Sequence, residues 1–161
     1  MDVYFDDRVL PIVQKAEKYC SADEHCRSSV RAKLFGWGAL RTDVDVIIEY
    51  LCENDYINEE RYALVYCNSK MRSQKWGRIK MAYQLRSKQI PKEIIESTLK
   101  QIDETAYNEI LDGLAESKWE LLADESDERK KRIKFFNFLA SKGFENDEIQ
   151  AVYDKLTNAS K

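Results

Sequence analysis

The sequence predicts an all-α protein, built as an elongated tandem array of three three-helix repeats. Its 161 residues include only five glycines and two prolines, the residues that β-rich folds use at their many turns. Apolar residues make up 43% of the chain and recur at three- and four-residue intervals. A short motif also returns at a fixed distance along the chain, which is typical of stacked helical repeats.

The returning motif is LRSKQI at residues 85–90, which matches LASKGF at residues 139–144 in its Leu, Ser, Lys and closing apolar residue. A looser counterpart begins at Leu34. Three units of about 50 residues account for the whole chain with short loops. We place them at residues 1–56, 57–103 and 104–161, and expect them to stack into an elongated surface that can be concave.

The first unit is expected to contain three short helices. Residues 9–19 carry apolar side chains at helical spacing, with a proline tolerated in the first turn. Ser21 or Asp23 can cap a second helix that runs to Phe35. Thr42 is a suitable N-cap for a third, although the sequence DVDV that follows it also alternates as a strand does.

The second unit repeats this plan. Asn58 is the expected cap of its first helix, whose inward face we assign to Tyr62, Val65, Tyr66 and Ser69. Gly77 separates this helix from the next, whose inward face we assign to Ile79, Ala82, Tyr83 and Leu85. Pro91 suits the first turn of the third helix.

The third unit opens with a longer acidic helix after Asp103. Its apolar spacing predicts an inward face of Tyr107, Ile110, Leu111, Leu114, Leu121 and Leu122. A basic helix is expected over residues 127–142, with Ile133, Phe136 and Leu139 facing inward, and a last helix over residues 146–156. The second and third units therefore share one plan.

Charge is segregated along the chain, although the net charge is only -3. Residues 43–60 contain seven acidic residues and no Lys or Arg, whereas residues 70–92 contain eight Lys or Arg and no Asp or Glu. Such a block can give one surface a positive potential while the whole protein stays acidic. The same pattern also fits helix faces that are simply solvated.

A basic stripe within this block is the candidate binding edge. Lys80, Gln84 and Lys88 fall on one side of a helix, and Lys130, Lys134 and Asn137 do the same in the third unit. An offset of 54 residues maps Lys80 onto Lys134 and Lys88 onto Lys142. Two such edges could follow a polyanion or an acidic protein groove, or serve solubility alone. Trp76 beside Gly77 fits either a contact residue or a plug between two helices. The candidate contact residues are Arg72, Lys75, Arg78, Lys80, Lys88, Lys130 and Lys134.

No catalytic, metal or cofactor site can be assembled from the sequence. The four cysteines form no Cys-x-x-Cys pair, and the only histidine, His25, adjoins Cys26 without ligand spacing. The sequence offers no nucleophile with an identifiable general base, and no glycine-rich loop that could bind phosphate. No apolar run approaches 18 residues, so we expect no membrane segment and a reducing, cytoplasmic location.

The stretch NEERYA at residues 58–63, followed by GRI at 77–79 and KQI at 88–90, resembles the bacterial RecX family of regulatory proteins. The residues that carry the resemblance are Glu59, Glu60, Arg61, Tyr62, Ala63, Gly77, Ile79 and Leu85. Two positions depart from the family pattern: Gln84 stands where Glu is usual, and Gln89 replaces a helix-ending glycine. A glutamine in a left-handed cap would be strained, so a different turn is expected before Pro91.

The resemblance implies a non-enzymatic modulator of the RecA recombinase. Members of this family build tandem three-helix units, associate with the RecA filament on single-stranded DNA, and restrain its ATPase, strand-exchange and co-protease activities. The resemblance therefore implies the RecA filament and single-stranded DNA as partners. We also expect a monomer that needs no cofactor. A stand-alone helical DNA-binding module and a protein–protein adaptor without DNA contact are the alternatives.

Overall fold

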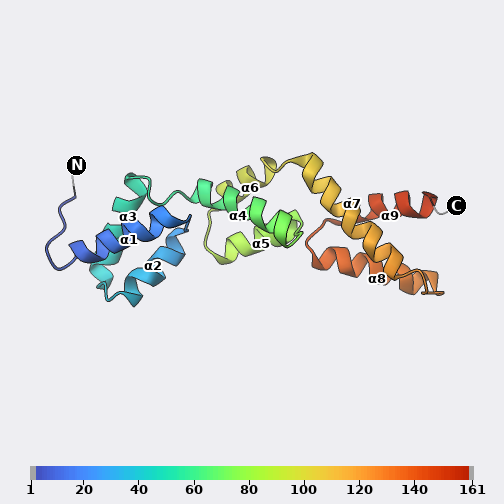
Figure 1. Ribbon diagram of the computed structural model, residues 1–161, viewed down its shortest axis with the longest axis horizontal. Helices are drawn as coiled ribbons and strands as arrows, with labels where there is room; N and C mark the ends of the chain where they lie inside the picture. Colours follow the sequence, from blue (N-terminus) through green and yellow to red (C-terminus); the bar gives the residue numbers. More distant parts are fainter. Residues whose placement is uncertain (1–2, 160–161) are drawn as a thin grey trace.

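The computed structural model describes residues 3–159, which form nine α-helices and no strand (Figure 1). In chain order the helices are α1 (Leu10–Ala22), α2 (Arg27–Gly36), α3 (Arg41–Glu53), α4 (Glu59–Ser73), α5 (Arg78–Ser87), α6 (Lys92–Lys100), α7 (Glu104–Leu121), α8 (Glu128–Ser141) and α9 (Asn146–Ala159). The all-α prediction is confirmed over the described part of the chain.

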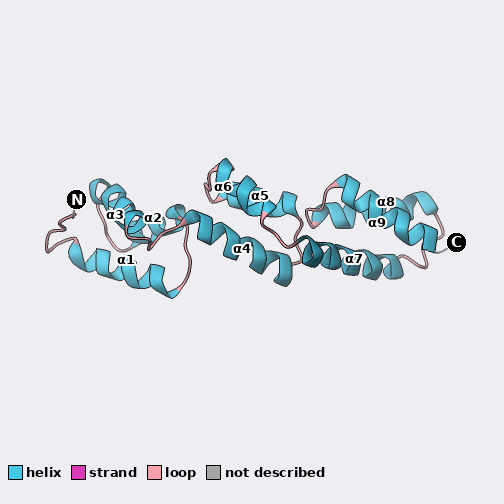
Figure 2. Cartoon of the chain, turned by 90° about the horizontal axis from the view of Figure 1, so that it is seen from above, coloured by secondary structure: helices cyan, strands magenta, loops and turns pink. Residues whose placement is uncertain are grey.

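The helices form an elongated array of three three-helix repeats, as predicted (Figure 1). We call them repeat 1 (α1–α3), repeat 2 (α4–α6) and repeat 3 (α7–α9). The two ends of the chain lie at opposite ends of the array, and α4 and α7 follow one another along one side of it (Figure 2). The boundaries at residues 56/57 and 103/104 stay a prediction.

Two hydrophobic cores hold the array together, and they do not coincide with the three repeats. Repeat 1 has a core of its own, which includes Val13, Leu34 and Ile47. Repeats 2 and 3 share a second core, in which Leu85 of α5 and Leu139 of α8 belong to one cluster of buried side chains. Repeats 2 and 3 are therefore packed as one body, because burial of their apolar side chains is continuous.

Helix starts follow the predicted caps in part. The Asn58 side chain accepts a hydrogen bond from the Arg61 backbone N–H at 2.9 Å, and Asp127 caps α8 in the same way. The caps predicted for repeat 1 are wrong. Cys26, rather than Ser21 or Asp23, occupies the N-cap of α2, and α3 begins before Thr42.

Several side chains predicted to face inward are exposed instead, namely Val65, Ser69, Ile79, Tyr83, Leu121 and Ile133. The buried stripe of α4 is instead Ala63, Cys67 and Met71. In α5 the predicted Ala82 and Leu85 are buried, and Met81 joins them in place of Ile79 and Tyr83. These helices carry apolar residues around most of their circumference, so periodicity does not select one face. The neighbouring helices decide which stripe is covered.

Each repeat ends its second helix with the same left-handed turn. Gly38, Gln89 and Gly143 all have positive φ, at 89°, 64° and 100°. In each turn the next N–H donates to a carbonyl five residues back, that of Leu34, Leu85 or Leu139. The expectation of a different turn at Gln89 is wrong, because the glutamine adopts the left-handed conformation that the glycines adopt.

Replacing Gln89 with glycine is expected to raise the free energy of unfolding by about 0.5–1 kcal/mol, because glycine enters the left-handed region without a Cβ penalty. Urea unfolding followed by circular dichroism measures the change. Gln74→Gly is the matched control, since Gln74 ends α4 with φ -102° and gains nothing from glycine. An unchanged or lower stability of Gln89→Gly would contradict the assignment of strain to this turn.

Candidate nucleic-acid interface

A row of aromatic and basic side chains runs along α4, beside its buried stripe. Tyr62, Tyr66 and Lys70 follow one another at four-residue spacing and are half-buried. The ring centroids of Tyr62 and Tyr66 lie 5.8 Å apart, and those of Tyr66 and Trp76 lie 6.4 Å apart. Three aromatic rings therefore form a continuous row that ends in the loop between α4 and α5.

Three lysines are placed over these rings. Lys70 lies 5.7 Å from the centroid of Tyr66 and 5.3 Å from that of Trp76. From α5, Lys80 lies 5.2 Å from the Trp76 ring and Lys88 5.7 Å from the Tyr66 ring. We call this set, Tyr62, Tyr66, Lys70, Trp76, Lys80 and Lys88, the basic-aromatic face.

The basic-aromatic face combines the two groups that hold single-stranded nucleic acid without reading its sequence. Aromatic rings stack on bases, and lysine ammonium groups neutralise phosphates. No Asp or Glu interrupts residues 70–92, so the lysines contributed by this segment are not opposed by acids within it. The face can therefore accept a negatively charged, unpaired strand.

A pocket of about 300 Å³ continues the face towards repeat 1, with His25 on one side and Tyr62, Tyr66 and Lys70 on the other. The His25 ring stacks on Tyr19, with centroids 3.8 Å apart. Burial lowers the pKa of His25 from its ordinary value near 6.5, so the imidazole is neutral at pH 7. Asp23 and Glu24 also line the repeat 1 side of the pocket, so the positive character of the face ends at this junction.

The seven predicted contact residues are distributed over the array and are not gathered at one place. Lys80 and Lys88 lie on the basic-aromatic face. Arg72 and Lys75 are exposed at the end of α4 and in the loop after it. Lys130 and Lys134 are exposed on α8 in repeat 3, where the Lys134 ammonium lies 2.7 Å from the Glu125 carboxylate.

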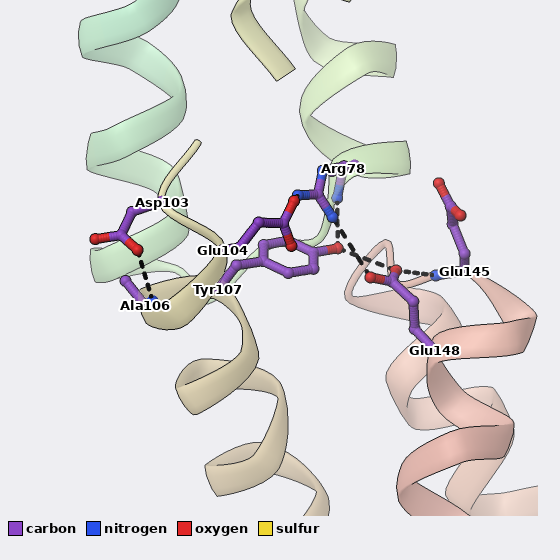
Figure 3. Close-up of polar contacts among 7 residues, drawn as sticks. All are labelled: Arg78, Asp103, Glu104, Ala106, Tyr107, Glu145 and Glu148. Carbon is purple, nitrogen blue, oxygen red and sulfur yellow. Dashed lines mark hydrogen bonds and ion pairs between the residues drawn. The ribbon is translucent and has the colours of Figure 1, made fainter. Parts of the chain in front are cut away.

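Arg78 has a different environment from the other predicted contacts. Its side chain is only 18% exposed and forms ion pairs with Glu104 of α7 and Glu148 of α9 (Figure 3). The guanidinium lies 4.1 Å from the centre of the Tyr107 ring. The Tyr107 hydroxyl accepts a hydrogen bond from the Arg78 backbone N–H and donates one to Glu148, both at 3.2 Å. Arg78 joins repeat 2 to repeat 3, and we omit it from the proposed contact set.

Four residues of the basic-aromatic face were absent from the predicted contacts: Tyr62, Tyr66, Lys70 and Trp76. The sequence predicts an inward position for both tyrosines and leaves Trp76 open between a contact residue and a plug between two helices. A signal was present in the sequence, because Ala63, Cys67 and Met71 form an alternative apolar stripe in α4. Choosing that stripe as the buried one places Tyr62, Tyr66 and Lys70 beside it, at its edge.

Most residues that carry the family resemblance have structural partners. Arg61 forms ion pairs with Glu24 of repeat 1 and with Asp55. Glu59 accepts a hydrogen bond from the Arg27 backbone N–H at 3.2 Å, and burial raises the pKa of its carboxyl. Ala63 and Leu85 are fully buried, while Glu60 and Ile79 are exposed. This pattern of residues therefore encodes caps and junctions between repeats more than a binding surface.

Within residues 3–159, no three His, Cys, Asp or Glu side chains gather in a way that could hold a metal ion. None of the helices in the same range combines the length and apolar character needed to cross a membrane. The basic-aromatic face is therefore the candidate site that we carry forward.

Two models of protein-family domains match this chain. The model described as "RecX, second three-helix domain" matches residues 58–99, and "RecX, third three-helix domain" matches residues 106–153. The chain belongs to the RecX family. The matched segments fall on α4–α6 and on most of α7–α9, so they contain the basic-aromatic face and the junction of repeats 2 and 3.

Relatives in the RecX family are named as regulatory proteins. "Regulatory protein RecX" of Clostridium perfringens strain 13 is 36% identical over 130 residues, which cover 80% of this chain and 60% of the relative. That of Clostridium tetani is 27% identical over 152 residues, covering 94% of this chain and 69% of the relative. The chain thus spans only part of these longer proteins.

Solved RecX structures have the same fold. The crystal structure of RecX from Lactobacillus salivarius superposes with a TM-score of 0.83 at 26% identity, covering 94% of this chain and 97% of that one. A second RecX crystal structure gives a TM-score of 0.78 at 21% identity, covering 94% and 79%. The tandem helical array is therefore shared with these RecX structures over 94% of this chain.

Proposed function

We propose that this chain is a non-enzymatic regulator that binds the RecA filament on single-stranded DNA and restrains its ATPase, strand-exchange and co-protease activities. Membership in a family of regulatory proteins supports a regulator. The basic-aromatic face supports single-stranded DNA in the filament as the target, because it combines three lysines with a row of three rings on one repeat.

In this proposal the array lies along the filament, and the basic-aromatic face meets exposed single-stranded DNA. Lysine ammonium groups of Lys70, Lys80 and Lys88 neutralise phosphates, and the rings of Tyr66 and Trp76 stack on bases. Arg72 and Lys75 extend the positive edge beyond α4, and Lys130 and Lys134 extend it onto repeat 3. Occupying the strand in this way blocks filament growth or promotes disassembly. The protein acts as a monomer in the cytoplasm, where RecA works.

Titrating the protein into a RecA ATPase reaction on single-stranded DNA tests the proposal. We expect inhibition at protein concentrations below that of RecA, because one bound molecule that blocks growth of a filament affects many RecA subunits. Lys80→Glu is expected to weaken inhibition, since it reverses a charge on the basic-aromatic face. Lys155→Glu serves as the control, because Lys155 lies on α9 beside Asp112, away from that face.

No inhibition at an excess over RecA would overturn the RecA proposal. If the protein then still binds DNA alone, the stand-alone DNA-binding module is supported. If it binds neither DNA nor the filament, the protein–protein adaptor is the remaining function.

A further inference from the structure

The two junctions between repeats are built from equivalent positions but from different residues. At each junction the start of one repeat's second helix faces the end of the next repeat's second helix. The residues at these two positions are Gly77 and Gly143 between repeats 2 and 3, whose backbones are in contact, and Cys26 and Gln89 between repeats 1 and 2. Only the junction of repeats 2 and 3 therefore has glycine on both sides.

The glycine pair brings two backbones into direct contact. A Cβ on Gly77 would lie 2.5 Å from the carbonyl carbon and oxygen of Gly143, and one on Gly143 would lie 2.5 Å from the Lys80 Cβ. At this distance the Gly77 N–H donates to the Lys142 carbonyl at 2.7 Å, and the Ile79 N–H to the Gly143 carbonyl at 3.0 Å. The free N–H groups of α5 are thus satisfied by the carbonyls that end α8.

The junction of repeats 1 and 2 is linked in a different way. Among residues 3–159 no backbone-to-backbone hydrogen bond joins α2 to α5, and the link is a 2.9 Å bond from the Ser28 hydroxyl to the Lys88 carbonyl. A surface pocket of about 520 Å³, open to solvent, lies at this junction and is lined in part by Arg27, Glu59 and Gln89. Solvent therefore reaches between repeats 1 and 2.

The equivalent arginines also behave differently. Arg78 reaches across its junction to acids of repeat 3, whereas the Arg27 guanidinium turns back to Glu49 of its own repeat, at 3.2 Å. The ion pair that does cross to repeat 1 joins Arg61 and Glu24, and the second Glu24 oxygen is buried without a hydrogen-bond partner among the described residues. Partly exposed ion pairs are screened by salt and constrain geometry weakly.

One contact near the centre of the junction remains well packed. Cys26 is fully buried in the core shared by repeats 2 and 3, against which Tyr62 packs, and its thiol is hydrogen-bonded to Ser28 and Ser29 of its own repeat. A single buried contact surrounded by polar links and an open pocket permits rotation more readily than separation.

We infer that repeat 1 swivels as a body about the Cys26–Tyr62 contact, while repeats 2 and 3 form one rigid unit locked by the Gly77–Gly143 backbone contact. This inference goes beyond the proposed function and does not depend on it. The swivel changes the width of the pocket between His25 and Tyr66, which crosses the same junction. Rotation of repeat 1 therefore opens or closes one end of the basic-aromatic face.

Distances between spin labels on the full chain test the swivel. Labels are attached through a ketone-bearing amino acid at the exposed positions Ala32, Lys100 and Ala140, so that the four cysteines stay intact. We expect a broader distance distribution for the Ala32–Lys100 pair than for the Lys100–Ala140 pair. The label at Lys100 is common to both pairs, so its own mobility contributes equally to the widths of the two distributions. Added salt is expected to broaden only the first distribution further.

A reciprocal variant completes the test. Gly143→Gln gives the junction of repeats 2 and 3 the glutamine that stands at the junction of repeats 1 and 2. It is expected to broaden the Lys100–Ala140 distance distribution and to leave the Ala32–Lys100 distribution unchanged. Equal widths for the two pairs in the unmodified sequence, or a narrower one across repeats 1 and 2, would overturn the inference. That result would not bear on inhibition of RecA, which the ATPase titration measures separately.

Discussion

Replacing Gly77 with alanine is expected to lower the free energy of unfolding by about 1–3 kcal/mol, as overpacking of a close contact does. The added Cβ would lie 2.5 Å from backbone atoms of Gly143, and backbone cannot move aside as a flexible side chain can. Relief of the clash would also break the Gly77–Lys142 hydrogen bond. Urea unfolding followed by circular dichroism measures the loss.

Gly113→Ala is the matched control for this substitution. Gly113 lies inside α7 with no atom within 4 Å of an added Cβ, so alanine there should stabilise the protein by roughly 0.5–1 kcal/mol. Opposite signs for the two substitutions are the expected result. Equal stability of Gly77→Ala and the unmodified protein would show that the backbone contact between repeats 2 and 3 is not tight.

Removing the rings of the basic-aromatic face is expected to reduce binding of single-stranded DNA. Tyr66→Ala and Trp76→Ala should each lower affinity by roughly 5- to 150-fold, since stacking of one base contributes about 1–3 kcal/mol. Fluorescence anisotropy with a labelled oligonucleotide measures the change. Both rings also pack against the core, so circular dichroism and the melting temperature must establish that each variant is folded.

Tyr83→Ala controls for the general loss of an aromatic ring. Tyr83 is 63% exposed on α5 and takes no part in the ring row, so its removal should leave affinity unchanged. Lys88→Met separates phosphate contact from stacking, because it should flatten the dependence of affinity on salt by roughly 0.7 in the log–log slope for a single strand. Unaltered affinity in folded Tyr66→Ala and Trp76→Ala would rule out base stacking here.

Repeats 2 and 3 are packed as one body, and repeat 1 is joined to them by a different kind of junction. The basic-aromatic face belongs to repeat 2, so its rings and lysines are held by the core that repeats 2 and 3 share. Substitutions at the junction of repeats 2 and 3 are therefore expected to act on stability first. Substitutions on the face away from that junction, such as Lys88→Met, should act on binding first. Lys80 belongs to both regions, because its ammonium donates to the Ser141 carbonyl of repeat 3 at 3.3 Å.

Local features of the sequence determined much of this protein. Helix caps such as Asn58 and Asp127 are set by hydrogen bonds within three residues, and the repeated Leu85 and Leu139 mark helix ends whose turns close within six residues. Few glycines and prolines and the 54-residue repetition were enough to predict the helical array. Such interactions are short-range, so the order of residues specifies them directly.

The tertiary structure alone decided which helix faces are buried and which charged residues are free. Ile79 and Tyr83 are exposed while Met81 and Ala82 are buried, because the neighbouring helices cover that side of α5. Arg78 looked like a binding residue until Glu104 and Glu148 were brought to it from 26 and 70 residues away. Contacts between residues so distant in the chain depend on how the repeats stack, and periodicity within one helix carries no information about that.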